Sequence, residues 1–429
     1  MGRRPTGAVQ GQETAPKGAV LGIYAKSHPT LESKGFFFWG EEPVIIDPET
    51  GEMLAELGPD RVATLERWAL HAVAQEVLGK TKHRVRGCCR WMARRKGEEG
   101  APRGVQVYRS LEHGTCSYGG LQTCGSVWVC PVCGAKITER RRVELKHAIE
   151  IHKERGGGVA LLTLTHPHTK ADRLADLLAA EQKAMTRFFG SRSGVELMAA
   201  MGRVGHVRAW EVTHGRKRGP GRDNGWHPHF HILLFLERPL SADELRAFED
   251  RAYQVWAPVC VRAGLDLPSR LHGVRLEDGS RAAEYAAKFG LEQPRWGLDA
   301  EMTKGHTKRA KDGETPFDLL RSILYEDDQG APALFREYAD AFKGKRQLVW
   351  SRGLRQLLDL GADVTDEELA AEQEDHAEIL GQLTVSEWHL VLRLDARGEL
   401  LEVARGGWAP VQQFLGVLRA LEVQLCRSG

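Results

Sequence analysis

Alternating histidines at the start of an apolar segment constrain this sequence more than any other feature. Residues 227–236 read His-Pro-His-Phe-His-Ile-Leu-Leu-Phe-Leu, and the β-forming apolar second half predicts a buried strand. Alternate residues of a strand share a face, so His227, His229 and His231 are expected on one side. Neutral imidazole is a common metal ligand, and this spacing lets neighbouring rings converge on one ion. The pattern therefore favours a metal site over a row of solvent-facing histidines.

The strand expected before the histidines supplies a candidate oxygen ligand. Residues 204–213 are predicted to form a strand, and a Gly-rich basic loop at 215–225 links it to the histidine strand. The two strands are therefore expected to pair as a long hairpin. Glu211, near the loop end of the first strand, would then face the histidines across the pair. The alternative is an ordinary exposed glutamate.

Three closely spaced cysteines form a second candidate metal site. Cys124, Cys130 and Cys133 follow the spacing Cys-x5-Cys-x2-Cys, and two thiolates separated by two residues can hold one tetrahedral Zn²⁺. A structural zinc is favoured over a redox-active pair because of the third cysteine and the proline between the thiols. The residues that compete for the fourth ligand position are Cys88, Cys89, Cys116 and His113.

Bulk composition limits the class of protein more than it indicates a function. The chain has 429 residues, of which 42% are hydrophobic, and this is enough for two or three globular domains. The net charge of +2 does not indicate a nucleic-acid partner, although local basic patches such as residues 140–146 could follow a phosphate backbone. The sequence contains no apolar run of bilayer length and no signal-peptide pattern, so we expect a cytoplasmic protein without membrane contact.

The order of the expected elements is that of an α+β fold with helices packed on one side of a sheet. Helices are expected near residues 65–77, 138–155, 174–188, 241–262 and 280–289, and strands near 159–165 and 271–276 besides the histidine hairpin and a short hairpin at 43–57. Further along, residues 316–342 are expected to form two helices, residues 388–394 and 399–404 a hairpin, and residues 410–425 a C-terminal helix. No Gly-x4-Gly-Lys-Ser/Thr loop is present, which disfavours an ATP-driven motor.

Four segments together resemble rolling-circle plasmid replication initiators of the HUH endonuclease superfamily, in the branch with an N-terminal cysteine motif. They are residues 123–133, 161–165, 225–231 and 284–288, and the resemblance as a whole covers roughly residues 80–360. It implies an antiparallel HUH-endonuclease-like sheet with helices packed on it, an N-terminal zinc-binding segment and a mainly helical C-terminal region.

The resemblance also implies roles for individual residues. His229 and His231 would bind Mn²⁺ or Mg²⁺ together with Glu211, and Tyr285 would be the nucleophile. His227 is expected to act in an outer shell or on a phosphate. Among the cysteines, the small residue and arginine that usually follow the upstream ligand favour Cys88 over Cys89, with Cys116 as a bystander.

Two positions near the nucleophile bear on the mechanism. Lys288, one helical turn after Tyr285, is placed to stabilise a phenolate or to hold the phosphate. Some relatives are thought to use a glutamate one turn before the tyrosine to activate water, but Arg281 occupies that position here. How the chain ends a replication round is therefore open. Candidate DNA contacts further along are Lys308, Arg309 and Arg346.

The same reasoning divides the chain into five segments. They are an N-terminal extension at 1–80 with about 20 disordered residues at its start, a zinc-binding segment and basic helix at 81–155, an HUH nuclease core at 156–300, a basic helical DNA-contacting region at 301–362, and a small C-terminal α/β unit at 363–429.

The function implied is that of a plasmid replication initiator that nicks one strand of a single-stranded or cruciform origin. The products would be a 5′-phosphotyrosyl link and a free 3′-OH, and a host helicase and DNA polymerase would be the partners. A conjugative relaxase, a single-strand transposase and a non-catalytic zinc-dependent DNA-binding protein are the alternatives. The oligomeric state cannot be predicted from the sequence.

Overall fold

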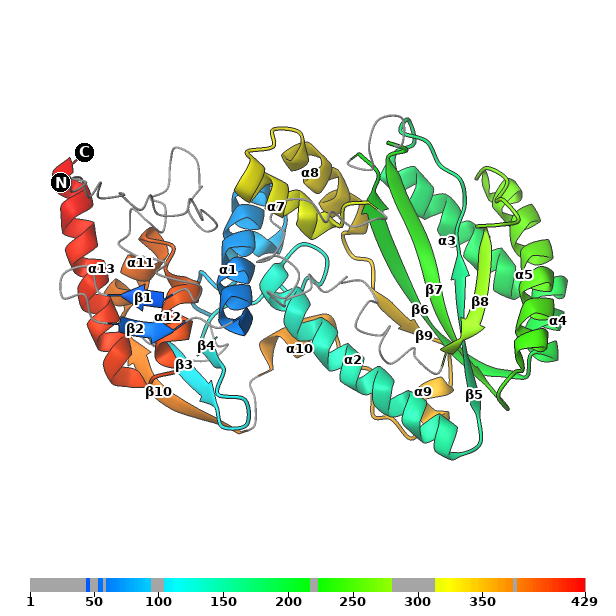
Figure 1. The fold of residues 1–429 in the computed structure, drawn as a ribbon, viewed down its shortest axis with the longest axis horizontal. Coiled ribbons are helices and arrows are strands. Elements are labelled where there is room, and N and C mark those ends of the chain that lie inside the picture. Colours follow the sequence, from blue (N-terminus) through cyan, green and yellow to red (C-terminus); the bar gives the residue numbers. More distant parts are fainter. Residues whose placement is uncertain are drawn as a thin grey trace, which may run out of the picture.

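The computed structural model describes residues 44–46, 53–56, 59–93, 104–216, 223–279, 313–372 and 376–428. The molecule is elongated, with a five-stranded sheet and its helices at one end and a smaller group of strands and helices at the other (Figure 1). A group of helices, α1 (Pro59–Leu78), α7 (Pro316–Glu326) and α8 (Ala331–Phe342), lies between them. None of the described helices is both long and apolar enough to cross a membrane.

Antiparallel pairing throughout defines the large sheet, whose strand order among the described residues is β8-β5-β7-β6-β9. Its strands are β5 (Gly158–Leu164), β6 (Arg203–His214), β7 (Trp226–Leu236), β8 (Val274–Asp278) and β9 (Leu348–Trp350). The expected hairpin is confirmed, because β6 and β7 pair along their whole length, from Arg203 opposite Leu236 to His214 opposite Trp226. Strand β9 falls in the region expected to be helical and to contact DNA, and it adds an edge beside β6.

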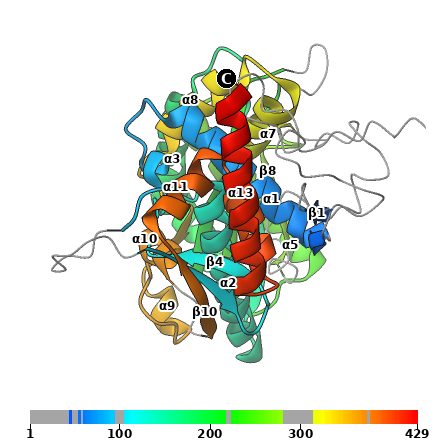
Figure 2. The ribbon, with the colours of Figure 1, turned by 90° about the vertical axis from the view of Figure 1, so that its left-hand side faces the viewer.

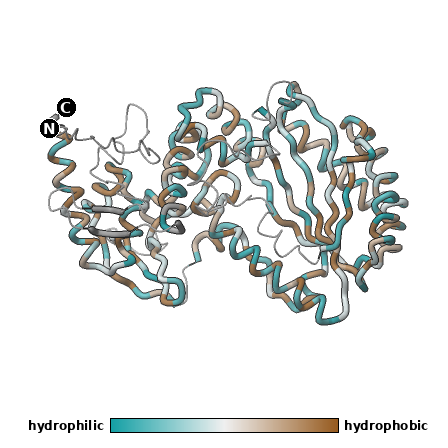
Figure 3. The backbone as a smooth tube through the Cα atoms, in the orientation of Figure 1, coloured by the Kyte–Doolittle hydropathy of each residue, from teal (hydrophilic) through white to brown (hydrophobic). Residues whose placement is uncertain are grey.

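Alternating apolar residues bury both faces of this sheet. On one face, Leu162 and Ile232 pack with residues of α3 (Leu174–Gly190), α4 (Arg192–Ala200) and α5 (Ala242–Ala263). On the other, Leu161 and Leu233 pack with α2 (Pro131–Glu154) and α9 (Leu354–Leu357). Figure 3 shows the hydrophobic stretches along these strands. The α+β class is confirmed, but the expectation of helices on one side only is wrong because α2 covers part of the second face.

Capping explains where several helices begin. Ser241 and Glu244 form the expected capping box at the start of α5. Helix α2 begins at Pro131, several residues before the expected start, because Cys130 acts as its N-cap and a proline is tolerated in the first turn.

The smaller end of the molecule joins segments that are far apart in the sequence. Strand β10 (Ala377–Leu383) pairs with β3 (Val105–Ser110), which pairs with β4 (Cys116–Gly119). Figure 2 shows this sheet beside α11 (Val385–Arg393) and α13 (Trp408–Ser428). The short hairpin of β1 (Val44–Ile46) and β2 (Met53–Glu56) forms as expected. The five-segment division stays a prediction, although this sheet ties residues 377–383 to residues 105–119.

The hairpin expected at residues 388–394 and 399–404 is wrong. The first run lies in α11 and the second in α12 (Arg397–Ala404). Thr384 and Glu387 form a capping box that starts α11, and Asp395, with a φ of 46°, turns the chain before α12. Local capping therefore outweighs the β-forming valines and leucines, and the strand of this region is β10 instead.

Candidate metal centres

Glu211, His229 and His231 meet on one face of the β6–β7 hairpin. The register places Glu211 directly opposite His229, and His231 follows two residues along the same face. The Nε2 atoms of the two histidines are 3.1 Å apart, and Oε2 of Glu211 lies 2.8 Å from Nε2 of His231 and 3.5 Å from Nε2 of His229. One ligand atom from each residue thus points to a common centre.

These separations fit a hard divalent cation. Ligands at the 2.0–2.1 Å typical of octahedral Mg²⁺ are about 3 Å apart when they are neighbours in the coordination shell. The three distances here bracket that value, and a carboxylate with two imidazoles suits Mg²⁺ or Mn²⁺. Three protein ligands on one side would leave the other positions open to substrate and water.

The second ring nitrogen of each histidine faces an oxygen. Nδ1 of His231 lies 3.0 Å from Oγ1 of Thr163, and Nδ1 of His229 lies 3.4 Å from the carbonyl oxygen of His227. Protons on both Nδ1 atoms would leave the Nε2 lone pairs directed at Glu211, so three acceptors converge. Such a set needs a cation, and either a metal or added protons can supply the charge.

The pKa values of Glu211 and His229 show how protons on the histidines compensate the charge of the carboxylate. Burial alone would raise the pKa of Glu211, but hydrogen bonds from His229 and His231 outweigh it, and the pKa is lowered. Burial would lower the pKa of His229, but hydrogen bonding and charge attraction to Glu211 raise it. The carboxylate is therefore held ionised, as a metal ligand must be.

His227 stands outside this group and contacts another histidine. Its Nδ1 lies 2.7 Å from Nε2 of His168, whose Nδ1 lies 2.8 Å from the carbonyl oxygen of Asn224. His166 lies in the same loop as His168, and its Nε2 forms a fully buried pair with Oε1 of Glu181 at 2.9 Å. The sequence predicts no role for His166, His168 or Thr163, although the His-Pro-His run at residues 166–168 was an available signal for the two histidines.

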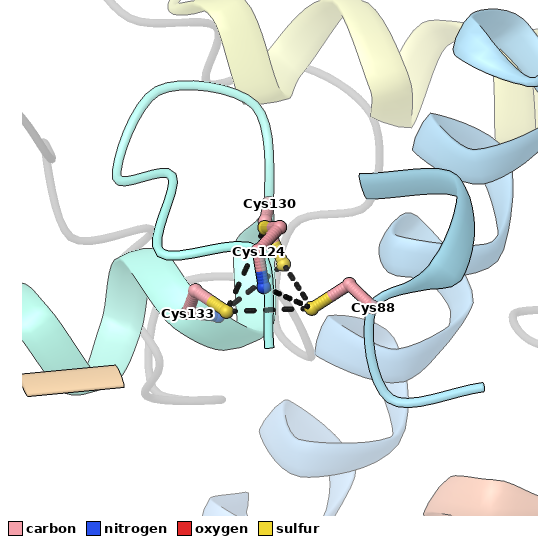
Figure 4. A group of neighbouring side chains, drawn as sticks. All are labelled: Cys88, Cys124, Cys130 and Cys133. Atoms are coloured by element: carbon pink, nitrogen blue, oxygen red, sulfur yellow. Dashed lines mark hydrogen bonds between the residues drawn. The ribbon is translucent and has the colours of Figure 1, made fainter. Parts of the chain in front are cut away.

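The cysteine cluster has the dimensions of a tetrahedral site. Cys88, Cys124, Cys130 and Cys133 converge, and all four are between 0% and 4% exposed (Figure 4). Their sulfur atoms are 3.4 to 3.7 Å apart in the contacts formed. Four thiolates at the Zn–S distance of 2.3 Å would be about 3.8 Å apart. The cluster therefore fits a zinc ion with little adjustment.

Backbone amides support the sulfurs. The amide of Cys133 donates to Sγ of Cys130, and the amide of Cys124 donates to Sγ of Cys88, each at 3.3 Å. Burial raises the pKa of Cys130, whereas hydrogen bonds from Cys124 and its other neighbours lower that of Cys133. Four thiolates packed this closely would repel one another, so they need a cation to coexist here.

The fourth cysteine of the cluster is Cys88 rather than the competitors. Cys89 lies beside it with a positive φ of 46° and its sulfur 3.8 Å from that of Cys88, outside the four-residue group. Cys116 lies in β4 and His113 is exposed at a turn.

Two side chains clamp the loop that carries Cys88. Gln75 of α1 donates through Nε2 to the carbonyl oxygens of Val85 and Cys88, at 3.0 and 2.9 Å. Arg397 of α12 donates to Oε1 of Gln75 at 3.2 Å and to the carbonyl oxygen of Cys89 at 3.5 Å. The cluster thus links the centre of the molecule to the C-terminal helices.

Four of the remaining expected site residues cannot be placed relative to either centre. Tyr285, Lys288, Lys308 and Arg309 lie outside the described residues. Arg346 is described and exposed, and its Nη1 lies 3.4 Å from Asp363. Its role as a DNA contact stays a prediction.

Comparison with known proteins identifies the family. The family described as "Replication protein" matches residues 120–245, which include three of the clustered cysteines and the whole β6–β7 hairpin. "Protein rep" of Streptomyces lividans is 32% identical over 361 residues, covering 68% of this chain and 77% of that protein. "Neomycin resistance protein" of Streptomyces cyanogenus is 31% identical over 143 residues, covering 27% of this chain and 31% of that protein. No solved structure matches. As the resemblance to plasmid replication initiators predicted, the chain belongs to the family of Rep replication proteins.

Proposed function

We propose that this chain initiates rolling-circle replication of a plasmid by cutting one strand of its origin with Tyr285 and later rejoining that strand. The observation that carries the proposal is the convergence of Glu211, His229 and His231 on one centre. Membership of the Rep family supports origin DNA as the substrate. A host helicase and DNA polymerase would then extend the new 3′ end.

The three convergent residues would hold Mn²⁺ or Mg²⁺ at the scissile phosphate. When bound, the ion supplies Lewis-acid relief of the negative charge on the phosphate oxygens. Glu211 and the two histidines fix its position, and Thr163 holds the ring of His231 in the orientation that directs Nε2 inward. The rigid hairpin therefore determines which phosphate is attacked.

The covalent step exchanges one phosphate ester for another. The phenol oxygen of Tyr285 forms a bond to phosphorus, and the bond between phosphorus and the 3′ oxygen breaks. The phenol loses its proton and the departing 3′ oxygen gains one, so a 5′-phosphotyrosyl link and a free 3′-OH result. Lys288 would stabilise the phenolate or hold the phosphate. Rejoining reverses the exchange, with a 3′-OH as the attacking group.

The cysteine cluster has a structural role in this proposal. It would hold zinc and fix the N-terminal end of α2, the helix that packs against the same sheet face as the metal ligands. Its burial leaves no open coordination position for a substrate. The two metal centres thus differ in chemistry as well as in place.

Cleavage of the single-stranded origin of the parent plasmid tests this function. Purified protein with Mn²⁺ or Mg²⁺ should cut the oligonucleotide at one position, and His231→Ala should abolish cutting because a ligand is lost. His113→Ala, an exposed histidine far from the hairpin in sequence, is the matched control and should cut normally. Cutting by His231→Ala at the wild-type rate with the same metal dependence would place the site elsewhere.

A further inference from the structure

Two arginines and a histidine cluster in the first half of β6. The cluster consists of Arg203, His206 and Arg208, and Nη1 of Arg203 lies 2.8 Å from Nδ1 of His206. Phe189, at the end of α3, stacks on the ring of His206 with a centroid separation of 4.4 Å and an interplanar angle of 6°. The guanidinium of Arg203 lies 5.7 Å from the centre of the Phe189 ring. His206 and Arg208 are two residues apart in one strand and therefore share a face.

Neither arginine has a carboxylate partner within the described part of the chain. Ion pairs occupy arginines elsewhere on the surface, such as Arg192 with Glu196 and Arg238 with Glu244, but Arg203 and Arg208 form none with the residues that the structure describes. Nε of Arg203 is buried and has no hydrogen-bond acceptor among the described residues. Both side chains are partly buried, so solvent screens their charges incompletely.

The pKa values of the three side chains are those expected of a cluster that has no anion to balance its charge. Burial lowers the pKa of Arg203 and of Arg208. Burial and then the two neighbouring guanidiniums lower the pKa of His206 to about 3, so the imidazole is neutral near pH 7. Because Nδ1 of His206 accepts from Arg203, its Nε2 carries the proton and is a donor.

A group with several anionic oxygens would satisfy this arrangement. Guanidinium groups bind phosphate through paired N–H donors, and such charge-assisted bonds are stronger than neutral ones. Partly buried cations without a counterion lower the stability of the fold. Such an arrangement is expected where a ligand supplies the counterion. In a replication protein that ligand is expected to be DNA.

We propose that Arg203, His206 and Arg208 bind backbone phosphates of origin DNA at a place separate from the cut. Arg208 and Glu211 are three residues apart in β6, so they point to opposite faces of the sheet. Another cation, Nζ of Lys345, lies 6.0 Å from the ring centre of Trp210, a residue on the same face of β6 as Arg208. The cluster would therefore hold the DNA outside the reacting segment. The inference rests on the proposed function only in taking DNA as the substrate.

Salt dependence of DNA binding tests the cluster. The full-length protein is titrated against a fluorescent duplex oligonucleotide and its single-stranded form at several salt concentrations. Each lost phosphate contact lowers the slope of log affinity against log salt by about 0.9 on duplex and about 0.7 on single strands. Arg203→Gln with Arg208→Gln should therefore lower the slope by about 1.8 or about 1.4 respectively.

Matched variants separate this effect from a general loss of positive charge. Arg192→Gln with Arg238→Gln removes the same charge from exposed arginines that are already ion-paired, and should leave both slopes unchanged. Arg203→Lys with Arg208→Lys keeps the charge and should retain the wild-type slope. Thermal unfolding adds a readout that a structural role would move in the opposite direction. The variant with Arg203→Gln and Arg208→Gln should melt at or above the wild-type temperature because two cations without an ion-pair partner are removed.

Two results would overturn the assignment. The first is an unchanged salt slope in the double glutamine variant on both forms of DNA. The second is found in the variant with Arg203→Lys and Arg208→Lys. If that variant has both a lower melting temperature and a reduced salt slope, the two arginines support the fold. Failure of this phosphate-site assignment is distinguishable from failure of the proposed function. The variant with Arg203→Gln and Arg208→Gln should still cut single-stranded origin DNA at a saturating concentration.

Discussion

Thr163 is placed to orient His231 so that its Nε2 points to the proposed metal site. The Thr163 hydroxyl lies 3.0 Å from Nδ1 of His231, and the two residues are paired across β5 and β7. Thr163→Val keeps the side-chain shape and removes that partner, so metal affinity should fall by about 10- to 100-fold. Titration of cleavage against Mn²⁺ and calorimetric Mn²⁺ binding would measure the change. Thr165→Val, which removes a hydroxyl bonded instead to the His272 carbonyl, should leave both curves unaltered. Equal Mn²⁺ dependence in Thr163→Val and wild type would exclude the positioning role.

His166 and Glu181 should make stability depend on pH. The side chains of this pair are fully buried, and although burial lowers the pKa of His166, the hydrogen bond and charge of Glu181 raise it overall. A raised histidine pKa stabilises the fold fully below the unfolded value of about 6.5, and the contribution is lost as pH rises through the folded value.

His166→Asn should therefore cost about 3 kcal/mol of unfolding free energy near pH 6, because a buried carboxylate loses its partner. The cost should shrink toward pH 9. Urea unfolding at several pH values measures it, with His147→Asn, an exposed histidine of α2, as the control. A cost that stays constant between pH 6 and pH 9 would show that His166 is neutral in the folded protein.

Residue types and spacing could predict Glu211, His229 and His231 because hairpin register is a local property. The pairing of Glu211 with His229 follows from two adjacent strands and one loop. The roles of His168 and Thr163 could not be predicted in the same way. His168 meets His227 only when the loop after β5 lies against the start of β7, and that contact depends on tertiary packing.

Among the elements, α2 shows how a charge pattern can mislead. Its arginines were expected to form a basic patch that could follow phosphates, yet Arg141 pairs with Asp363 at 2.9 Å and with Asp366 at 3.4 Å. Arg140 pairs with Glu372 at 3.2 Å. Much of the charge on this helix is thus neutralised by the acidic segment around α10 (Asp366–Ala371). Arg203 and Arg208, which form no ion pair with any described residue, lie instead in β6, in a sequence region with no visible basic run.

Helix α5 and the β6–β7 hairpin were predictable because capping residues and alternation are adjacent in sequence. The sequence wrongly predicts a hairpin for α11 and α12, because their short apolar runs fit the two-residue period of a strand as well as the 3.6-residue period of a helix. Strand β10 was missed because its partner β3 lies more than 250 residues away. Pairing over that distance has no local signature.

The cysteine knuckle that begins α2 should fold only with its metal. Cys130→Ser removes one ligand and the sulfur that accepts from the Cys133 amide, so bound zinc should be lost and α2 should lose its N-terminal anchor. Metal analysis and thermal unfolding would show a lower zinc content and a lower melting temperature. Cys426→Ser, at an exposed position in α13, should change neither. A wild-type protein that is fully folded without zinc would contradict the structural role.

At the scale of the whole molecule, the cysteine cluster joins parts that are distant in sequence. Gln75 of α1 and Arg397 of α12 both hold the loop of Cys88, and β10 completes the sheet of β3 and β4. The β6–β7 hairpin, with the proposed metal site, lies at the opposite end of the elongated molecule from that sheet (Figure 1). Loss of zinc should therefore loosen the association of the C-terminal helices with the rest of the protein, while the hairpin keeps its own register.

Mass spectrometry of the product formed with single-stranded origin DNA tests the cutting mechanism most directly. Wild-type protein should yield a peptide containing Tyr285 that carries the 5′ end of the cut strand. Tyr285→Phe keeps the aromatic ring and removes only the attacking oxygen, so its fold and DNA binding should persist while cutting and the adduct disappear. An adduct on Tyr253, or continued cutting by Tyr285→Phe, would contradict the assignment.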